Sequence, residues 1–598
     1  MTSSQSISTP FLLNSATTTT MAEEEKGQLE PQSYWTWCKK DFYPEPSFQS
    51  WKSYKSAVLQ TGFRFKDRFF DRSTDINELE VRKESVNEMQ KCLTWWDLIW
   101  LAFGSVVGTG IFVLTGQEAH NHAGPAIVLS YAISGLSALL SVFCYTEFAI
   151  EVPVAGGSFS YLRIELGDFV AFIAAGNILL EAVVGAAGLA RSWSSYFSTF
   201  IGLKPDSLRF HVSSFADGFN MLDPLAFVAL IFWSSIPMFG TFKASLLNTI
   251  ASIVTVVLIV FVMITGFVKG ELSNLSPFVP YGAGGVFQAA AVLFWAYTGF
   301  DMVATMAEET KKPARDIPIG LIGSMSMITV VYCLMALALS MMVKYTEMDV
   351  NAAFSVAFKS IGMNWATYLV AFGALKGMST GLMVGALGQG RYTTQIARSH
   401  MIPPYFARVH PKRGTPINAT LVVTLTSACI AFFTGLDVLS SVSSLSTLFV
   451  FMLMAVALLV RRYYVNDVSS KSDLLKLWIF LLMIIGSSAG TSAYYYARPN
   501  GWFGHAITLP IWFLGTLGLA VILPQQKAPK VWGVPLVPWL PSLSIAINLF
   551  LIGALGSQAF VRFAICTGVM LVYYVFVGLH TTYDVAHNKP PAVESLAE

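Results

Sequence analysis

Apolar residues along this chain gather into long blocks, and Gly, Pro and charged residues mark the joins between the blocks. A helix needs ~20 apolar residues to cross the hydrocarbon core of a bilayer, so each block predicts a transmembrane helix. Fourteen are predicted, near residues 95–116, 125–147, 169–199, 224–240, 245–268, 286–308, 318–343, 364–396, 416–434, 438–460, 474–496, 504–523, 540–557 and 560–581. The predicted fold class is an all-α integral membrane protein.

Lys and Arg residues between the blocks predict how the helices are oriented. With the amino terminus in the cytosol, the inward loops hold 16 of these residues and the outward loops hold seven. Residues 1–91 add 12 more on the inside. Cytosolic loops of membrane proteins are enriched in Lys and Arg, so we expect both termini in the cytosol.

Composition supports the membrane class and excludes several others. Only 12% of the residues are charged, whereas soluble proteins carry about 25%. The net charge of +2 is too small to indicate a nucleic-acid partner. The cysteines are scattered, and their spacing predicts neither a disulfide framework nor a metal site. They are Cys38, Cys92, Cys144, Cys333, Cys429 and Cys566. No cofactor is predicted.

The segment before the first block carries no targeting signal. The first 20 residues are rich in Ser and Thr and contain neither a basic residue nor an apolar core, which excludes a secretory signal peptide. We expect residues 1–91 to form a cytosolic, partly disordered arm with a short helix around residues 76–90.

A few ionisable residues fall inside the apolar blocks. They are Glu147, Glu181, Arg191, Asp301 and Lys376. A charge at the bilayer centre is unfavourable unless it faces a cavity or a partner, so each is a functional candidate. A structural ion pair is the alternative for each of them, above all for Glu147 and Lys376.

Two of the blocks contain glycines at which a helix can break. The first carries Gly108-Thr109-Gly110 near its middle, and the sixth carries Thr298-Gly299 followed by Asp301. Glycine lowers the cost of leaving helical geometry. Interrupted helices at matching positions of two halves indicate the substrate site of a transporter.

The chemistry of such breaks suits an amino acid. Freed N–H groups at the start of a half-helix bind a carboxylate with help from the helix dipole. Freed carbonyls at the end of another half-helix accept hydrogen bonds from an ammonium. The alternative is that the glycines only allow close packing of helices.

At these residues the chain resembles the amino acid–polyamine–organocation superfamily, and within it the plant-type cationic amino acid transporters. The matching stretches span residues from about 95 to 583 in order. They are Gly104–Gly116, Tyr145–Ala149, Pro153–Tyr161, Gly176–Glu181, Phe294–Glu309, Lys312–Gly320, Ala371–Gly377, Thr415–Thr420 and Trp532–Trp539.

The resemblance implies an architecture. It predicts a five-plus-five inverted repeat in residues 92–460, with helices 1 and 6 broken, and four further transmembrane helices in residues 461–583. Residues 584–598 would form a cytosolic tail. The implied function is a secondary transporter that moves amino acids across a membrane by alternating access, with basic amino acids as the preferred substrates.

The resemblance also assigns roles to residues. Val107, Gly108, Thr109 and Gly110 would bind the substrate carboxylate, and the backbone of Ala296, Tyr297 and Thr298 would take its ammonium group. Trp295 occupies the place of a gating aromatic and could stack on a cationic substrate.

An acidic pair in similar bacterial proteins matches Glu181 and Asp301. There it works with a lysine on the fifth helix, where this chain has Thr255 instead. Loss of that lysine puts the bacterial coupling scheme in doubt, and a proton remains a candidate coupling ion at Glu181, Thr255 or Asp301. A membrane potential alone supplies ~2.3 kcal/mol per charge per 100 mV. That is enough to concentrate a monovalent cation roughly fortyfold.

Other functions compete with this interpretation. An amino acid sensor could keep the fold and only signal, and the carrier could prefer neutral or acidic substrates such as Gln and Glu. No histidine or serine arrangement in the chain indicates an enzyme. We recognise no sorting signal in the two terminal segments, and we expect the protein in the plasma membrane rather than in the vacuolar membrane.

Overall fold

The structure is a computed structural model. It describes residues 38–69, 72, 93–107, 110–153, 157–216, 218–239, 241–301, 310–411, 413–465, 468–498 and 501–587, with the backbone alone for 40 and 241–253. The helix expected around residues 76–90 lies outside these ranges.

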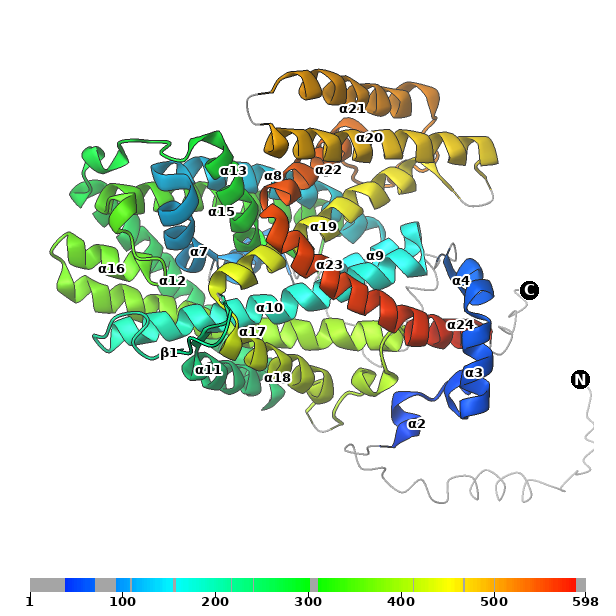
Figure 1. The fold of residues 1–598 in the computed structure, drawn as a ribbon, viewed down its shortest axis with the longest axis horizontal. Helices are drawn as coiled ribbons and strands as arrows, with labels where there is room; N and C mark the ends of the chain where they lie inside the picture. The colour runs from blue at the N-terminus through cyan, green and yellow to red at the C-terminus, as the bar shows by residue number, and fades with distance from the viewer. Residues whose placement is uncertain are drawn as a thin grey trace, which may run out of the picture.

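Within the described residues the protein is built almost entirely from helices (Figure 1). The α-helices are α2 Lys39–Phe42, α3 Trp51–Leu59, α4 Thr61–Phe69, α6 Trp95–Val106, α7 Gly110–Glu118, α8 Ile127–Glu151, α9 Gly157–Leu166, α10 Asp168–Phe200, α11 Pro224–Ser235, α12 Thr241–Lys269, α13 Gly282–Leu293, α15 Pro313–Met342, α16 Ala353–Ser360, α17 Asn364–Arg398, α18 Ile417–Phe433, α19 Leu436–Tyr463, α20 Lys471–Ala497, α21 Phe503–Ile522, α22 Trp539–Ala554, α23 Gly556–Tyr573 and α24 Leu579–His587.

Shorter elements join them. The short 3₁₀ and π turns are η1 Pro46–Phe48, η2 Ala119–Ala123, η3 Gly124–Ala126, η4 Ile236–Phe239, η5 Leu272–Leu275, η6 Phe294–Tyr297, η8 Tyr345–Glu347, η9 Pro404–Ala407 and η10 Tyr574–Gly578. An antiparallel pair of two-residue strands, β1 Phe210–His211 and β2 Met221–Leu222, lies in the loop between α10 and α11.

Local sequence explains where the helices begin. Thr94 and Asp97 form a capping box at the start of α6, where Asp97 accepts hydrogen bonds from the backbone N–H and the hydroxyl of Thr94. Pro224 and Pro313 occupy the first helical positions of α11 and α15, where no N–H is needed.

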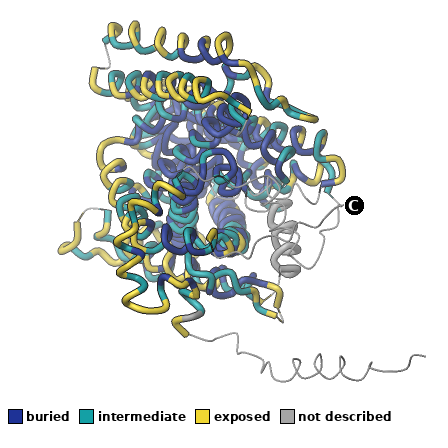
Figure 2. Tube along the Cα trace, turned by 90° about the vertical axis from the view of Figure 1, so that its right-hand side faces the viewer, coloured by how far each residue is buried: buried dark blue, intermediate teal, exposed yellow. Residues whose placement is uncertain are grey.

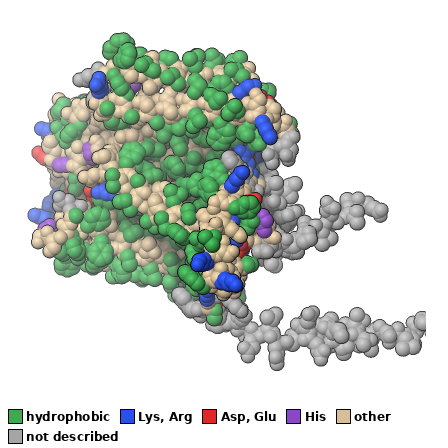
Figure 3. All heavy atoms as spheres, turned by 45° about the vertical axis from the view of Figure 1, so that its right-hand side comes forward, with side chains coloured by type: hydrophobic (Ala, Val, Ile, Leu, Met, Phe, Trp, Pro, Cys, Tyr) green, Lys and Arg blue, Asp and Glu red, His purple; other side chains and the backbone are tan. Residues whose placement is uncertain are grey.

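The helices match the hydropathy of the sequence. Eight helical stretches of the described chain are long and apolar enough to cross a membrane, and five shorter apolar helices accompany them. Buried residues gather in the interior in Figure 2, whereas the outer helices are largely exposed. Hydrophobic side chains spread across the face shown in Figure 3, and charged side chains gather towards its left and right edges. This distribution is expected of a protein that passes through a bilayer.

The helices around the centre pack into two groups. One group contains α6, α7, α8, α13 and α15, and α15 lies along both α6 and α8. The other contains α10, α11, α17 and α18, which lie below the first group in Figure 1. α12 contacts both groups through α15 and α17, and α19 contacts both through α8 and α10.

Glu147 belongs to a buried ion-pair network at one end of the helices. Its carboxylate accepts hydrogen bonds from Arg462 at 2.8 Å and from the backbone N–H of Val534 at 2.8 Å. Arg461, the neighbour of Arg462, pairs with Glu165 at 2.5 Å. Of the two roles that the sequence left open for Glu147, the structure shows the structural ion pair, because Arg462 balances its charge where α8 meets α19.

Arg191 has a structural place at the opposite end of the helices. Its guanidinium donates to the carbonyl of Ala431 at 3.2 Å and to that of Met221 at 2.9 Å. Nearby, Arg209 pairs with Asp223 at 3.0 Å. These contacts tie α10 to the loop that carries the two short strands.

Part of the arm is folded against the transmembrane helices, which the sequence did not predict. α4 packs against α24, and Tyr54 of α3 contacts His580 of α24, so both arm helices lie beside this helix (Figure 1). Arg64 pairs with Asp584 at 3.1 Å, and Arg68 pairs with Asp168 at the start of α10. Earlier in the arm, before α3, Glu45 pairs with His400 at 2.7 Å. The described part of the arm thus joins α10, α24 and the segment after α17.

The buried network makes a testable contribution to stability. We expect Glu147→Ala to lower the free energy of unfolding by ~3 kcal/mol, because it leaves the buried guanidinium of Arg462 without its carboxylate. Denaturant unfolding of the purified protein in detergent measures the change. Lys476→Ala, which removes the partly exposed pair with Asp473, is the control and should cost less than ~1 kcal/mol. Equal effects of the two substitutions would contradict the structural role of Glu147.

Candidate functional site

The first interrupted helix breaks at the glycines that the sequence indicated. α6 ends at Val106, with Val107 buried as its C-terminal cap, and α7 begins at Gly110. Gly108 and Thr109, expected to bind a carboxylate, lie outside the described residues. Gly110 is pressed against the second break, since a Cβ added there would lie 2.2 Å from Cα of Ala296. The two breaks therefore meet through their backbones, and only glycine fits at this position.

The second interrupted helix unwinds in steps. After α13 the chain tightens into the 3₁₀ turn η6, becomes extended at Thr298, and reaches a φ of +105° at Gly299. Glycine adopts this left-handed backbone without the strain that a side chain would add. The hydroxyl of Ser105 on α6 donates to the carbonyl of Gly299 at 3.1 Å, so a hydrogen bond also joins the two breaks.

Tyr332 on α15 links the breaks a third time, and the sequence did not point to it. Its hydroxyl lies 3.0 Å from the carbonyl oxygen of Val106 and 3.1 Å from that of Ala296. Both carbonyls lie beside the helix breaks, and the fully buried phenol is within hydrogen-bond distance of both. Ala296 and Tyr297 are fully buried, and Tyr297 donates its hydroxyl to the carbonyl of Tyr131 at 2.8 Å.

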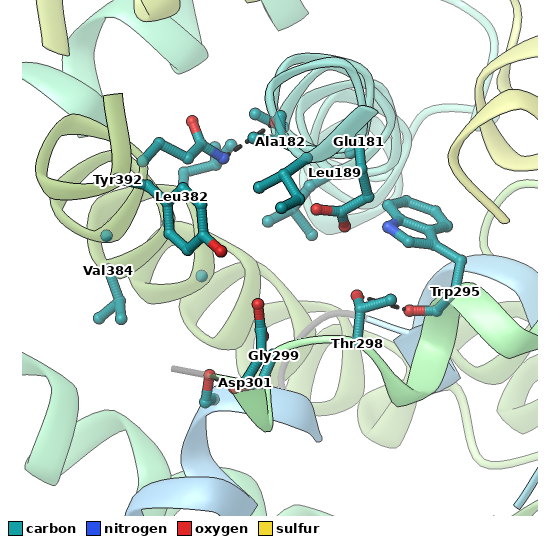
Figure 4. Close-up of a pocket in the computed structure, with 18 of the residues that line it drawn as sticks. Glu181, Ala182, Leu189, Trp295, Thr298, Gly299, Asp301, Leu382, Val384 and Tyr392 are labelled. Carbon is teal, nitrogen blue, oxygen red and sulfur yellow. Dashed lines mark hydrogen bonds between the residues drawn. The ribbon is translucent and has the colours of Figure 1, made fainter. Parts of the chain in front are cut away.

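A cavity of about 160 Å³ opens between the two helix groups, beside the breaks (Figure 4). Its lining residues come from α6, α10, α17, η6 and the unwound segment after η6. They are Gly104, Ser105, Ile178, Leu179, Glu181, Ala182, Gly185, Ala186, Leu189, Trp295, Thr298, Gly299, Asp301, Thr380, Gly381, Leu382, Val384, Gly385, Gly388, Gln389 and Tyr392.

The candidate site residues divide into two sets by their place relative to this cavity. Glu181, Trp295, Thr298 and Asp301 line it. Val107, Gly110, Ala296 and Tyr297 are buried beside it. Thr255 is buried in α12, and neither Thr255 nor the half-buried Lys376 is among the lining residues.

α17 forms a whole wall of the cavity that the sequence interpretation missed. Gln389 donates from its side-chain amide to the carbonyl of Ala182 at 2.9 Å and so ties α17 to α10. The hydroxyl of Tyr392 lies 2.7 Å from that of Ser158 and accepts a hydrogen bond from the N–H of Phe159. A repeated glycine pattern in a 35-residue helix, at positions 377, 381, 385, 388 and 390, was the signal that could have located this wall.

Trp295 covers one side of the cavity, and glycines on α10 make room for it. A Cβ at Gly185 would lie 3.2 Å from the indole nitrogen, and a Cβ at Gly188 would lie 2.9 Å from Cη2. The same Cβ at Gly185 would lie 3.7 Å from a carboxylate oxygen of Glu181. The indole thus rests on the glycine face of α10 next to Glu181, as Figure 4 shows.

The charge of the lining is one-sided. Among the described lining residues, Glu181 and Asp301 are the acidic ones, and none is Lys, Arg or His. Both also line a smaller adjoining cavity of about 30 Å³, to which Asn177 and Ser446 contribute. Charges interact more strongly in such a poorly solvated place than in water, so these two acidic side chains dominate the electrostatics of the described lining.

Comparison with known proteins points the same way. A family model described as amino acid permease matches residues 93–522, and a model of the permease C-terminus matches residues 532–582. Among curated proteins of Arabidopsis thaliana, "Cationic amino acid transporter 8, vacuolar" is 66% identical, covering 94% of this chain and 97% of that protein. "Cationic amino acid transporter 5" is 62% identical over 94% of this chain and 99% of its own length. "Cationic amino acid transporter 1" is 57% identical over 92% of each.

One expectation is corrected by these relatives. The sequence favoured the plasma membrane over the vacuolar membrane, and this was wrong, because a relative with 66% identity is named as vacuolar. The expectation did not rest on any particular residue. Sorting signals are short motifs that receptors recognise, and hydropathy and charge do not reveal them.

The contact between the breaks predicts how the protein responds to one extra methyl group. Gly110→Ala should lower the free energy of unfolding by at least ~2 kcal/mol, because its Cβ would overlap the backbone of Ala296. Gly284→Ala is the matched control: no heavy atom lies within 4 Å of its added Cβ, and stability should change by less than ~1 kcal/mol. Denaturant unfolding in detergent compares the two. A Gly110→Ala protein as stable as the control would show that the breaks do not touch as described.

Proposed function

The chain belongs to the amino acid permease family, and from this premise we propose that it carries basic amino acids, Lys and Arg, through the cavity between its two helix groups. The family's activity is amino acid transport across a membrane. The preference for basic substrates rests on one observation: among the described residues that line the cavity there are two carboxylates and no basic side chain. A substrate side chain that ends in an ammonium or guanidinium group would find an acidic partner there, whereas a neutral side chain would not use it.

The two ends of the substrate would be held by different parts of the site. The N–H groups that begin α7, from Gly110 onward and with Gly108 and Thr109 before them, would bind the α-carboxylate. The unwound backbone between Ala296 and Thr298 would accept the α-ammonium group. The side chain would then extend towards Glu181 and the wall of α17, with Trp295 above it.

The packing of the helices supports the inverted repeat. The first group contains the predicted spans 1, 2, 6 and 7, and the second contains spans 3, 4, 8 and 9. Each span thus lies in the same group as the span five places later, which is what a five-plus-five repeat produces. We propose that residues 92–460 form this core and that residues 461–583 add four helices. Alternating access would then be a rotation of one group against the other around the cavity.

The driving force of transport follows from the charge of the substrate. A basic amino acid carries one net positive charge, so a membrane potential alone drives it. Coupling to protons would use Glu181 or Asp301, the acidic residues among the described lining. Thr255 lies outside the lining and has no ionisable group, which makes it a poor proton carrier.

Uptake of radiolabelled arginine into proteoliposomes tests transport itself. A potential of ~100 mV, negative inside, should concentrate arginine roughly fortyfold. An amino acid sensor that only signals would accumulate none, and a carrier for neutral or acidic substrates would accumulate glutamine or glutamate in preference.

Glu181 should set the preference for basic substrates. We expect Glu181→Gln to lower kcat/KM for arginine about tenfold or more relative to glutamine, because it removes a charged partner of the guanidinium. The exposed Glu347 of an outward loop provides the control Glu347→Gln, which should leave the ratio unchanged. An unchanged ratio for Glu181→Gln would remove this carboxylate from the side-chain pocket.

Gly188 should control how Trp295 closes the site. Gly188→Ala places a Cβ 2.9 Å from the indole, so the ring cannot rest on α10 and kcat for arginine should fall about tenfold. Trp295→Phe in the same protein should restore part of the loss, because the smaller ring clears the methyl group. Gly486→Ala, with no heavy atom within 4 Å of the added Cβ, is the control. A loss that Trp295→Phe does not relieve would mean that Gly188 serves only helix packing.

A further inference from the structure

The two arm helices α3 and α4 present large apolar side chains to the outside. Trp51 is 79% exposed, Leu59 is 80% exposed and Phe63 is 66% exposed. Lysines lie among them on the exposed surface, and these are Lys52, Lys55 and Lys66. With 3.6 residues per turn, positions 51, 52, 55 and 59 share one face of α3. We call this surface, from Trp51 to Lys66, the arm face.

The opposite side of the arm helices is fixed to the transmembrane helices. The hydroxyl of Tyr54 donates to the carbonyl of Phe576 at 3.2 Å, and its ring meets that of His580 edge-on. Arg64 is buried and pairs with Asp584. The side that docks on the transmembrane helices is thus already occupied. Phe63 borders this side, with its ring edge-on to Tyr583 of α24, and Trp51 and Leu59 are the most exposed apolar residues of the arm face.

The arm face continues the exposed apolar surface of α23, which belongs to a helical stretch long and apolar enough to cross a membrane. Phe576, to which Tyr54 is bonded, is 47% exposed, and Val569 and Val572 of α23 are 66% and 59% exposed. α3 and α4 run across the ends of α10 and α17 rather than along them (Figure 1). A helix in this direction lies parallel to the membrane plane, where the hydrocarbon beside α23 gives way to headgroups.

We propose that the arm face is a lipid-binding surface that sits in the headgroup layer and recognises anionic phospholipids. Trp and Phe side chains at this depth contribute apolar contact, and lysines reach past them to phosphate groups. The arm face carries three lysines and no acidic residue, and the next residue, Asp67, is 38% exposed at its side chain and lies 3.7 Å from His587. Such a mixture of basic and large apolar residues is the composition of helices that bind membrane surfaces. The proposal rests on the proposed function only in needing a membrane-spanning chain, and the substrate does not enter it.

Photocrosslinking from the arm face tests the proposal in the full-length protein. p-Benzoylphenylalanine is placed at Leu59, the protein is reconstituted in nanodiscs of phosphatidylcholine with 30% phosphatidylserine, and lipid adducts are identified by mass spectrometry. We expect adducts at Leu59 in which phosphatidylserine exceeds its bulk share at least threefold. The same probe at Leu482, exposed on α20, should give adducts in bulk proportion, and at Ser207 in an outward loop should give none.

Charge reversal then separates lipid recognition from simple proximity. Lys52→Glu with Lys55→Glu should remove the enrichment of phosphatidylserine at Leu59, whereas Lys471→Glu, an exposed lysine at the start of α20, should not. Absence of lipid adducts at Leu59, adducts without enrichment, or a crosslink to a second copy of the chain would each overturn the proposal. Arginine uptake by each variant is measured alongside, so a protein that binds lipid but transports nothing refutes the proposed function alone.

Discussion

The contact between Gly110 and Ala296 is the constraint on which the site depends. A half-helix exposes backbone groups that lipid cannot satisfy, so a broken helix survives in a membrane only where other protein atoms take over. Here protein atoms take over at the junction of the two breaks. The backbones pack together at Gly110, Ser105 donates to the carbonyl of Gly299, and the hydroxyl of Tyr332 on α15 lies between the carbonyls of Val106 and Ala296. The cavity opens beside this junction, where both helices are interrupted.

The charged side chains at the centre of the molecule and those towards its ends have different surroundings. Glu147, Arg191 and Arg462 are paired or hydrogen-bonded at helix ends, where they join elements without facing the cavity. Glu181 and Asp301 instead face the cavity from opposite helix groups. A cation that enters between them would contact both groups at once, which gives the substrate a direct means of changing how the groups are arranged.

Hydropathy and motifs predicted where the apolar helices lie, and they singled out four of the residues that line the cavity, Glu181, Trp295, Thr298 and Asp301. The breaks were readable because Gly108, Gly110 and Gly299 interrupt apolar blocks, and Glu181, Trp295 and Asp301 stand out as charged or bulky residues beside them. The wall of α17 was missed because it consists of glycines, Gln389 and Tyr392, which look like ordinary helix packing until the partner helix is known. Tyr332 was missed for a similar reason, since only the fold brings its hydroxyl to the carbonyls of Val106 and Ala296. The arm helices could not be found by hydropathy because α4 is held by Arg64 and Arg68, whose partners lie far along the chain.

The account claims that the cavity between the helix groups holds a basic amino acid with its charged end at Glu181. A structure of the protein in a membrane mimetic with saturating lysine tests this most directly. The account predicts ligand density beneath Trp295, with the ε-ammonium group ~3 Å from the carboxylate of Glu181. An empty cavity in a protein that transports lysine, or a lysine whose ε-ammonium group points away from both Glu181 and Asp301, would contradict it.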